Sequence, residues 1–240
     1  MREDKSPFFI APHRFDAPED DAAPVLDRRY ELVPEPGERV LGRYPTSVAG
    51  CLVSPTGARG HWVLPAPASV TVTDRRLAYV CLAGDLALVA GKIDSTGVRH
   101  RRNVRLPRLV SGQIRWQWPS RLELRTTGPT QDATAEAELL VVCDALRTIQ
   151  QPALALGGTV GTVTELARLI RRTVACFRVT RPELVELAPP ERDVLIRRAT
   201  AAPVTGEGRV TLPGSLPVEF LSREDYYRVP ERAGKDAVGS

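Results

Sequence analysis

The sequence predicts a mainly β protein whose folded part ends in one α-helix. Apolar and polar residues alternate over several short stretches, which is the period of a half-buried strand. The 21 prolines and 18 glycines make 39 of the 240 residues, a share above the roughly 12% of an average protein, and they separate these stretches. One later stretch, residues 164–177, spaces its apolar residues at the helical period instead.

Residues 1–36 precede the predicted fold as an acidic, proline-rich extension. They carry 5 Lys and Arg residues against 9 Asp and Glu residues. We expect a partly disordered segment, because it has too little apolar surface to offset the entropy of ordering it. The triplet Phe8-Phe9-Ile10 either contacts the protein's own core or serves as a peptide for a partner.

The ordered domain is expected to begin at residue 37. Residues 37–41 open a first strand, and a Pro/Gly-rich loop is expected over residues 54–68. Residues 69–73 then alternate valine with serine and threonine, and residues 77–82 are almost continuously apolar. Because Asp tolerates turn geometry, we predict a hairpin with its turn at residues 74–75.

Five more strands follow in the prediction, at residues 86–90, 106–110, 113–118, 122–126 and 138–143. Ile114, Trp116 and Trp118 share one face by alternation, which favours core positions for both tryptophans. Pro119-Ser120 is the expected turn to the next strand.

The helix is predicted from an N-cap and an apolar stripe. Thr164 is the expected N-cap, and the stripe consists of Leu166, Leu169, Ile170, Val174 and Phe177. The glycine-rich residues 157–161 before it are interpreted as a flexible link. An alternative is that they place the helix N-terminus near an anion, although the Gly-Lys-Ser/Thr ending of a phosphate loop is missing.

Residues 181–240 are predicted to form a C-terminal extension interrupted by proline and glycine. One short amphipathic helix is expected near residues 191–199, and residues 233–240 read as a free tail.

Two motifs carry a family resemblance. Residues 37–40 read GERV and residues 70–77 read VTVTDRRL, which together resemble the pattern of bacterial pleckstrin-homology-like (PH-like) and GRAM-like domains. The resemblance covers residues 37–180. It implies a small barrel of about seven antiparallel strands whose open end is capped by one amphipathic helix.

The same resemblance implies a non-catalytic binding or scaffolding module. Family members that bind phosphoinositides carry a lysine-rich pattern in and after their first inter-strand loop. Here that loop, residues 46–68, offers only Arg59 and His61 as basic candidates. We therefore expect a protein partner first and an anionic membrane surface second, with no cofactor.

Positive charge is concentrated in the middle of the chain. Residues 37–182 carry 20 Lys and Arg residues against 10 Asp and Glu residues. The densest cluster, here called the arginine cluster, consists of Arg99, Arg101, Arg102, Arg105 and Arg108. It is the candidate site for an anionic ligand or partner, since Arg engages phosphate bidentately, and the alternative is a solvated loop.

A nucleic-acid-associated protein is the second functional hypothesis. It would combine the arginine cluster with Trp116 and Trp118 as stacking platforms. Weaker anionic-ligand candidates are Lys92 and the turn residues Arg75 and Arg76. The alternative for the two turn residues is a pairing with Asp74 or exposure to water.

An enzyme is the third hypothesis. His13, His61 and His100 are scattered, and the sequence contains none of the common nucleophile, nucleotide or zinc motifs. The cysteines occur singly among apolar residues, so buried reduced thiols are expected and no metal site. With no 18-residue apolar run, the sequence predicts a cytoplasmic protein that is at most peripheral to a membrane.

Overall fold

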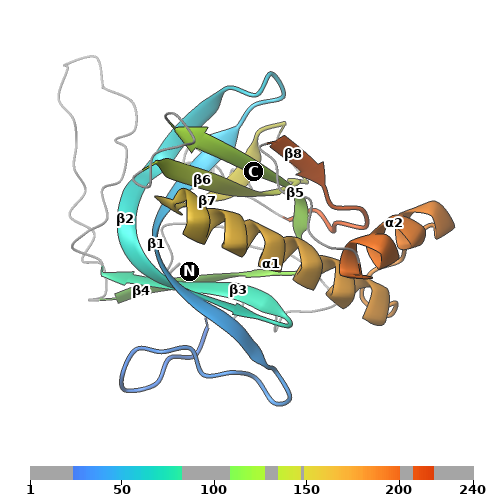
Figure 1. Cartoon of the computed structure of the whole chain (residues 1–240), viewed down its shortest axis with the longest axis horizontal. Helices are drawn as coiled ribbons and strands as arrows, with labels where there is room; N and C mark the ends of the chain where they lie inside the picture. The colour runs from blue at the N-terminus through green and yellow to red at the C-terminus, as the bar shows by residue number, and fades with distance from the viewer. Residues whose placement is uncertain (1–23, 83–108, 128–134, 147–148, 201–207, 219–240) are drawn as a thin grey trace, which may run out of the picture.

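The computed structural model describes residues 24–82, 109–127, 135–146, 149–200 and 208–218 (Figure 1). Its strands are β1 (Val40–Val53), β2 (Arg59–Thr73), β3 (Arg76–Leu82), β4 (Leu109–Arg115), β5 (Pro119–Thr127), β6 (Glu136–Cys143), β7 (Gln151–Thr159) and β8 (Gly208–Thr211). Its helices are α1 (Val160–Thr180) and α2 (Pro189–Thr200). The expected strand at residues 86–90, and most of that at 106–110, lie outside the described residues.

The strands form one antiparallel sheet in the order β4-β3-β2-β1-β7-β6-β5-β8. The prediction of a mainly β protein with a helix towards its C-terminus is confirmed. The prediction of a small barrel is wrong, because the sheet does not close: β4 and β8 stand at opposite ends of the order and do not pair in the described chain. The local alternation of apolar and polar residues predicts strands. Whether the two edge strands of a sheet meet depends instead on how strongly the whole sheet bends.

Two long strands, β1 and β2, supply that bend. The pairing register between them shifts at Val40/Gly42, at Val48/Gly50 and at Gly50/Cys51. Such bulges bend a strand and increase its local twist. Figure 1 accordingly shows β3 and β4 on one side of α1 and β5, β6 and β7 on the other.

The hairpin of β2 and β3 is confirmed. Val70 pairs with Tyr79 and Val72 with Leu77, and all four side chains are buried. The predicted loop at residues 54–68 is too long, because β2 already begins at Arg59. Pairing with β1 holds this segment as a strand although its prolines and its glycine disfavour that conformation, because β propensity depends strongly on context.

The turn between β4 and β5 comes earlier than predicted. Trp116-Gln117-Trp118 form the turn, and Pro119 begins β5. Both tryptophan side chains are buried, as alternation predicted, and Trp116 donates its indole N–H to the Thr73 carbonyl at 2.9 Å. The hydrogen bond satisfies the one polar group of this ring.

Helix α1 starts five residues before the prediction. Thr159 is the N-cap, and its hydroxyl accepts from the Thr162 amide. The glycine-rich residues 157–161 are no flexible link, since they end β7 and begin α1. Leu166, Ile170, Val174 and Phe177 are buried in one core with side chains of β1 to β7, while Leu169 is partly buried against it.

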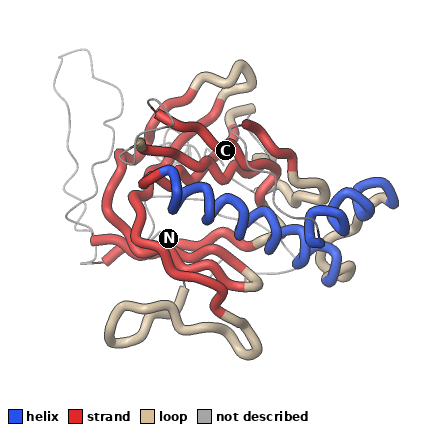
Figure 2. Tube along the Cα trace, viewed as in Figure 1, coloured by secondary structure: helices blue, strands red, loops and turns tan. Residues whose placement is uncertain are grey.

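The chain after α1 returns to the sheet. α2 packs beside α1, and Figure 2 shows it beyond the ends of the strands. The helix expected near residues 191–199 lies within α2. β8 then adds a short strand to the edge of β5, with Glu123 opposite Arg209. Residues from the predicted C-terminal extension thus contribute to the same sheet.

Candidate functional site

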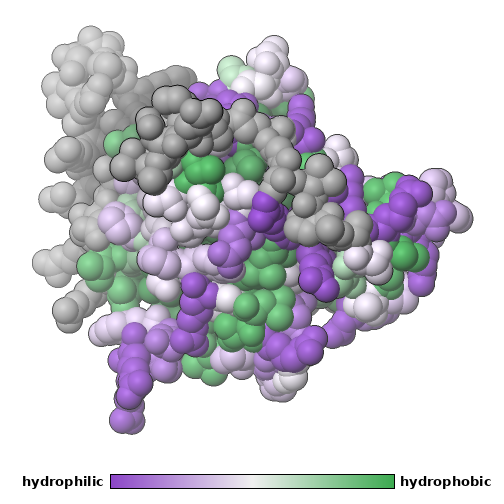
Figure 3. All heavy atoms as spheres, in the orientation of Figure 1, coloured by the Kyte–Doolittle hydropathy of each residue, from purple (hydrophilic) through white to green (hydrophobic). Residues whose placement is uncertain are grey.

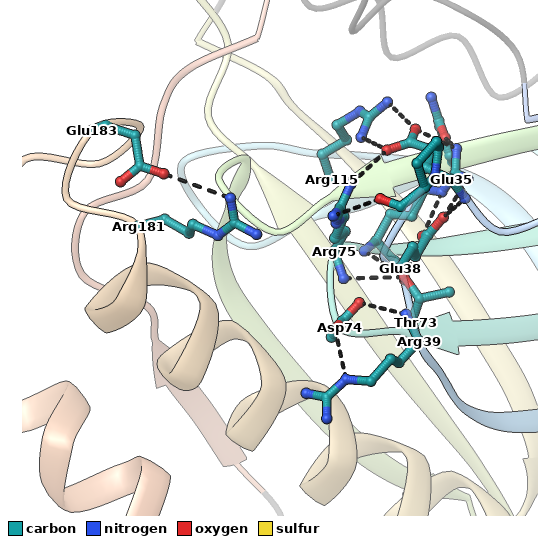
Figure 4. A network of polar contacts seen from close by, with 12 residues as sticks. Glu35, Glu38, Arg39, Thr73, Asp74, Arg75, Arg115, Arg181 and Glu183 are labelled. Atoms are coloured by element: carbon teal, nitrogen blue, oxygen red, sulfur yellow. Dashed lines mark hydrogen bonds and ion pairs between the residues drawn. The ribbon is translucent and has the colours of Figure 1, made fainter.

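Lys92 and the arginine cluster, residues 99–108, lie outside the described residues. Arg75 and Arg76, the weaker candidates, lie at the β2–β3 turn and enter a network of charged side chains shown in Figure 4.

Arg76 forms the buried centre of this network. Its Nε and Nη2 donate to the two carboxylate oxygens of Glu38 at 2.9 and 2.7 Å, and both side chains are buried. Nη1 donates to Gln113 at 2.6 Å. The Thr73 hydroxyl donates to Glu38 at 2.6 Å. This bidentate geometry is the strong form of an Arg–carboxylate pair, and it leaves Arg76 turned away from solvent.

Glu35 extends the network towards the surface. Arg115 donates to it at 2.6 Å, Arg76 lies at 3.1 Å and Arg75 at 3.5 Å. Arg75 also donates to the Pro36 carbonyl at 3.0 Å. The hydrogen bond from Arg115 is the largest influence on the pKa of Glu35 and, with the nearby arginine charges, lowers it despite partial burial. Ion pairs therefore attach residues 24–39, here called the N-terminal strap, to the sheet.

Asp74 pairs with a residue that the sequence did not indicate. Its carboxylate accepts from the Arg39 amide at 2.9 Å and from the Arg39 side chain at 3.2 Å. The proposed pairing of Asp74 with Arg75 or Arg76 is not among the contacts of the described residues. In Figure 4 the pair Arg181–Glu183 lies apart from this network, beyond the end of α1.

A second buried arginine, Arg178 of α1, was missed by the sequence analysis. It donates to the carbonyls of Trp116 at 3.0 Å and Pro119 at 2.6 Å, and to those of Leu212 at 2.8 Å and Pro213. Burial lowers its pKa to about 9, so the guanidinium stays charged at neutral pH. The signal was available, because residue 178 is four beyond Val174 and continues the buried stripe.

Arg178 and α2 together hold the last described segment. Arg198 of α2 donates to the Thr211 carbonyl, which directly precedes the two carbonyls bound by Arg178. Two helices thus present one arginine each to consecutive carbonyls at the end of β8. The arrangement joins α1, α2, β8 and the β4–β5 turn.

The N-terminal strap also carries a tight, exposed hairpin. Asp27 accepts from the amides of Arg29 and Glu31, and Leu26 bridges to Leu32. Tyr30 at its tip has a φ of 65°, which is unusual for a bulky residue. The backbone hydrogen bond with Glu31 is the largest cause of a lowered pKa at Asp27. Arg28, Arg29 and Tyr30 consequently project from an ordered turn.

Exposed apolar side chains gather in and after this hairpin. Val25 is 65% exposed and Tyr30 is 51% exposed, and Val33, Val40 and Leu41 are exposed as well. Other large apolar side chains are exposed elsewhere on the described surface, namely Leu64, Leu82, Leu146, Ile149, Leu184 and Ile196. On the face drawn in Figure 3, apolar areas lie between hydrophilic ones. The strap and the first two residues of β1 are here called the strap surface.

The described residues contain no group of three or more His, Cys, Asp and Glu side chains placed to hold a metal ion. Cys51, Cys81 and Cys143 are buried thiols, whereas Cys176 is exposed, contrary to the prediction of four buried thiols. No helix in the described chain is long and apolar enough to span a membrane. No family model, no curated protein and no solved structure matches the chain.

Proposed function

We propose that the chain is a non-catalytic binding module of PH-like or GRAM-like type that recognises a protein partner. The succession of seven strands followed by one buried helix supports this proposal, as does the central position of β1 between β2 and β7. The final strand β8 is an addition to that pattern.

The strap surface is the observation that carries the proposal. It combines exposed valines with a tyrosine and with Arg28 and Arg29, and tyrosine and arginine are enriched in protein interfaces. The Asp27 turn fixes the tip before any partner arrives, so less conformational entropy is lost on binding. The strap surface carries three arginines against four carboxylates, so it has no excess of positive charge to attract a polyanion. A protein partner fits this mixture of apolar and charged side chains better than a polyanion, which would leave the valines in water.

The charged network supports a binding role over a catalytic one. Glu38 and Arg76 are buried and satisfied by one another, and Glu35 is occupied by arginines. Groups engaged in this way stabilise the attachment of the strap. They offer no free acid, base or nucleophile to a substrate.

The test is site-specific crosslinking in the native cell. A photoreactive phenylalanine analogue at position 30 is expected to capture one protein, and the analogue at position 149 is not. Ile149 is the matched control because it is also an exposed apolar residue, in the β6–β7 connection.

Reconstitution with the captured protein then gives the quantitative result. The double variant Val25→Asp and Val33→Asp should weaken its Kd about tenfold or more, since an interface core excludes charge. Leu146→Asp with Ile149→Asp should leave the Kd unchanged. Equal weakening by the two double variants would rule out the strap surface as the interface. Capture of nucleic acid or of membrane vesicles in place of a protein would favour a nucleic-acid partner or an anionic membrane surface instead.

A further inference from the structure

The outer face of β5, the face turned away from α1, carries a second group of charged side chains. Leu122 and Leu124 point into the core shared with α1. Because side chains alternate along a strand, Arg121, Glu123 and Arg125 all lie on the opposite face. β5 therefore presents two arginines with a carboxylate between them.

β8 brings a third arginine to the same carboxylate. Arg209 is paired directly across from Glu123, and its Nε lies 3.5 Å from Oε1 of Glu123. Arg121 donates to that oxygen at 2.7 Å, and Arg125 lies 3.2 Å from Oε2. Three guanidinium groups therefore share one carboxylate. Within the described residues, Glu123 is the one carboxylate within ion-pair distance of any of them.

The three arginines are not equivalent. Arg121 is buried, and it also donates to Gln151, which in turn donates to Asp144. Arg125 and Arg209 are 45% and 62% exposed, and each has a single long contact to Glu123. Arg121 thus anchors Glu123, while Arg125 and Arg209 keep most of their donors directed to solvent.

We infer that Arg125 and Arg209 form a binding site for a phosphate monoester dianion, with Glu123 as the residue that positions them. The site lies on another face than the strap surface and does not rest on the protein-binding proposal. Residues in the diagonal relation of Arg125 and Arg209 lie about 7–8 Å apart, so the ends of these two long side chains can converge on one phosphate. Each guanidinium fork can then donate two parallel hydrogen bonds to the ligand.

The charge balance favours a dianion over a carboxylate or a halide ion. Glu123 offsets one of the three guanidinium charges. Glu138 lies opposite Arg125 on β6 but is already paired with Arg59, so the group retains an excess of positive charge. Burial by itself raises the pKa of Glu123, but the hydrogen bond from Arg121 and the charges of Arg209 and Arg125 lower it overall, so Glu123 remains ionised. Two guanidinium groups at one place also fit a single phosphate group. A nucleic-acid strand would need a series of such contacts along its backbone.

The experiment uses the full-length chain and phenyl phosphate as the probe. Arginine Nε–Hε signals are followed by NMR during a titration, with sodium chloride at equal ionic strength as the reference. Saturable shifts are expected at Arg125 and Arg209, with smaller shifts at Arg121. Shifts of equal size at all exposed arginines, or none that saturate, would overturn the site.

Two matched double variants separate a site from general attraction. Arg125→Ser with Arg209→Ser should weaken phenyl phosphate binding about tenfold or more, because both bidentate contacts are lost. Arg28→Ser with Arg29→Ser removes the same charge from the strap and should leave binding unchanged. An equal loss in both variants would mean that only net charge matters, and no site would remain.

Two further arms identify the source of the phosphate. Glycerol 3-phosphate tests a soluble ester, and phosphatidylcholine vesicles with added phosphatidic acid test a lipid headgroup. Saturable shifts of the Arg125 and Arg209 signals with glycerol 3-phosphate or with the vesicles would support the site. If neither of these ligands nor phenyl phosphate produced saturable shifts, the site would be contradicted. The strap variant Val25→Asp with Val33→Asp should retain phosphate binding, so this result is independent of the protein-binding proposal.

Discussion

Arg178 shows how one side chain can join parts of the chain that are distant in sequence. Its guanidinium is fully buried and donates to four backbone carbonyls on two separate segments. A buried charge is tolerable only when it is hydrogen-bonded in this way. The contact therefore belongs to the stability of the fold.

We expect Arg178→Met to lower the free energy of unfolding by about 3 kcal/mol or more, because it leaves buried carbonyls without donors. Arg172→Met is the control, since Arg172 is exposed on the same helix. Urea unfolding followed by circular dichroism gives both values. Similar values for the two variants would contradict the role assigned to Arg178.

Glu38 provides a second residue-scale prediction. Replacing it by Gln keeps the shape but leaves the buried Arg76 guanidinium without its carboxylate, so a loss of about 3 kcal/mol is expected. Glu31→Gln removes an exposed pair with Arg43 and should cost no more than about 1 kcal/mol. Denaturant unfolding of both variants measures the difference. A small loss for Glu38→Gln would mean that Gln113 and Glu35 suffice to satisfy Arg76.

At the scale of elements, the N-terminal strap should loosen in acid. The pKa of Glu35 is lowered from 4.5, so the unfolded chain binds this proton more readily than the folded one. The stabilisation is therefore complete above pH 4.5 and is lost as the pH falls through the lower, folded-state value. Hydrogen exchange of residues 24–38 should accelerate over that range. In Glu35→Gln the same segment should exchange faster at neutral pH and respond less to acid.

β8 is an element whose removal has a defined expected result. A chain ending at Thr200 lacks the carbonyls of Leu212 and Pro213 and leaves the β5 edge unpaired. Unpaired edges associate with other chains. We expect a lower unfolding midpoint and association visible by light scattering. A chain ending at Val218 keeps every described contact of β8 and should behave as the full chain, and aggregation of that chain as well would contradict the assignment to β8.

At the scale of the whole molecule, thiol reactivity reports whether the fold is intact. Burial is the main cause that raises the pKa of Cys51 to about 11 and of Cys143 to about 12, and Cys81 is buried too. We expect one fast thiol, Cys176, in the folded protein and four after denaturation. Ellman's reagent at neutral pH measures both counts. A second fast thiol in the native protein would show that the core opens locally.

Local pattern predicted the elements of this molecule better than their assembly. Alternation over residues 69–82 gave the hairpin, and the stripe from Leu166 to Phe177 gave the helix, because each depends on neighbours in sequence. Pairing of β1 with β7 joins residues 47 and 157, and no local period encodes it. The open edges of the sheet, and with them the missing barrel closure, follow from such distant pairings.

Charged partners were the least predictable part. Glu35 was assigned to a disordered acidic extension, yet it contacts Arg115 of β4. The partner of Arg76 lies 38 residues earlier, and the partners of Arg178 are backbone carbonyls that leave no mark in a sequence. The group around Glu123 could be anticipated only in part, since Arg121, Glu123 and Arg125 share a face by alternation but Arg209 arrives through β8.

The late arrival of β8 bears on how the protein is made. A ribosome adds about 5–20 residues per second, and domains form as their segments emerge. β1 must wait for β7 on one side, and Arg178 remains without half of its carbonyl acceptors until Leu212 and Pro213 have been synthesised. A nascent chain that folds as far as α2 would therefore leave the edge of β5 unpaired and Arg178 with only the carbonyls of Trp116 and Pro119, and a chaperone could bind that edge.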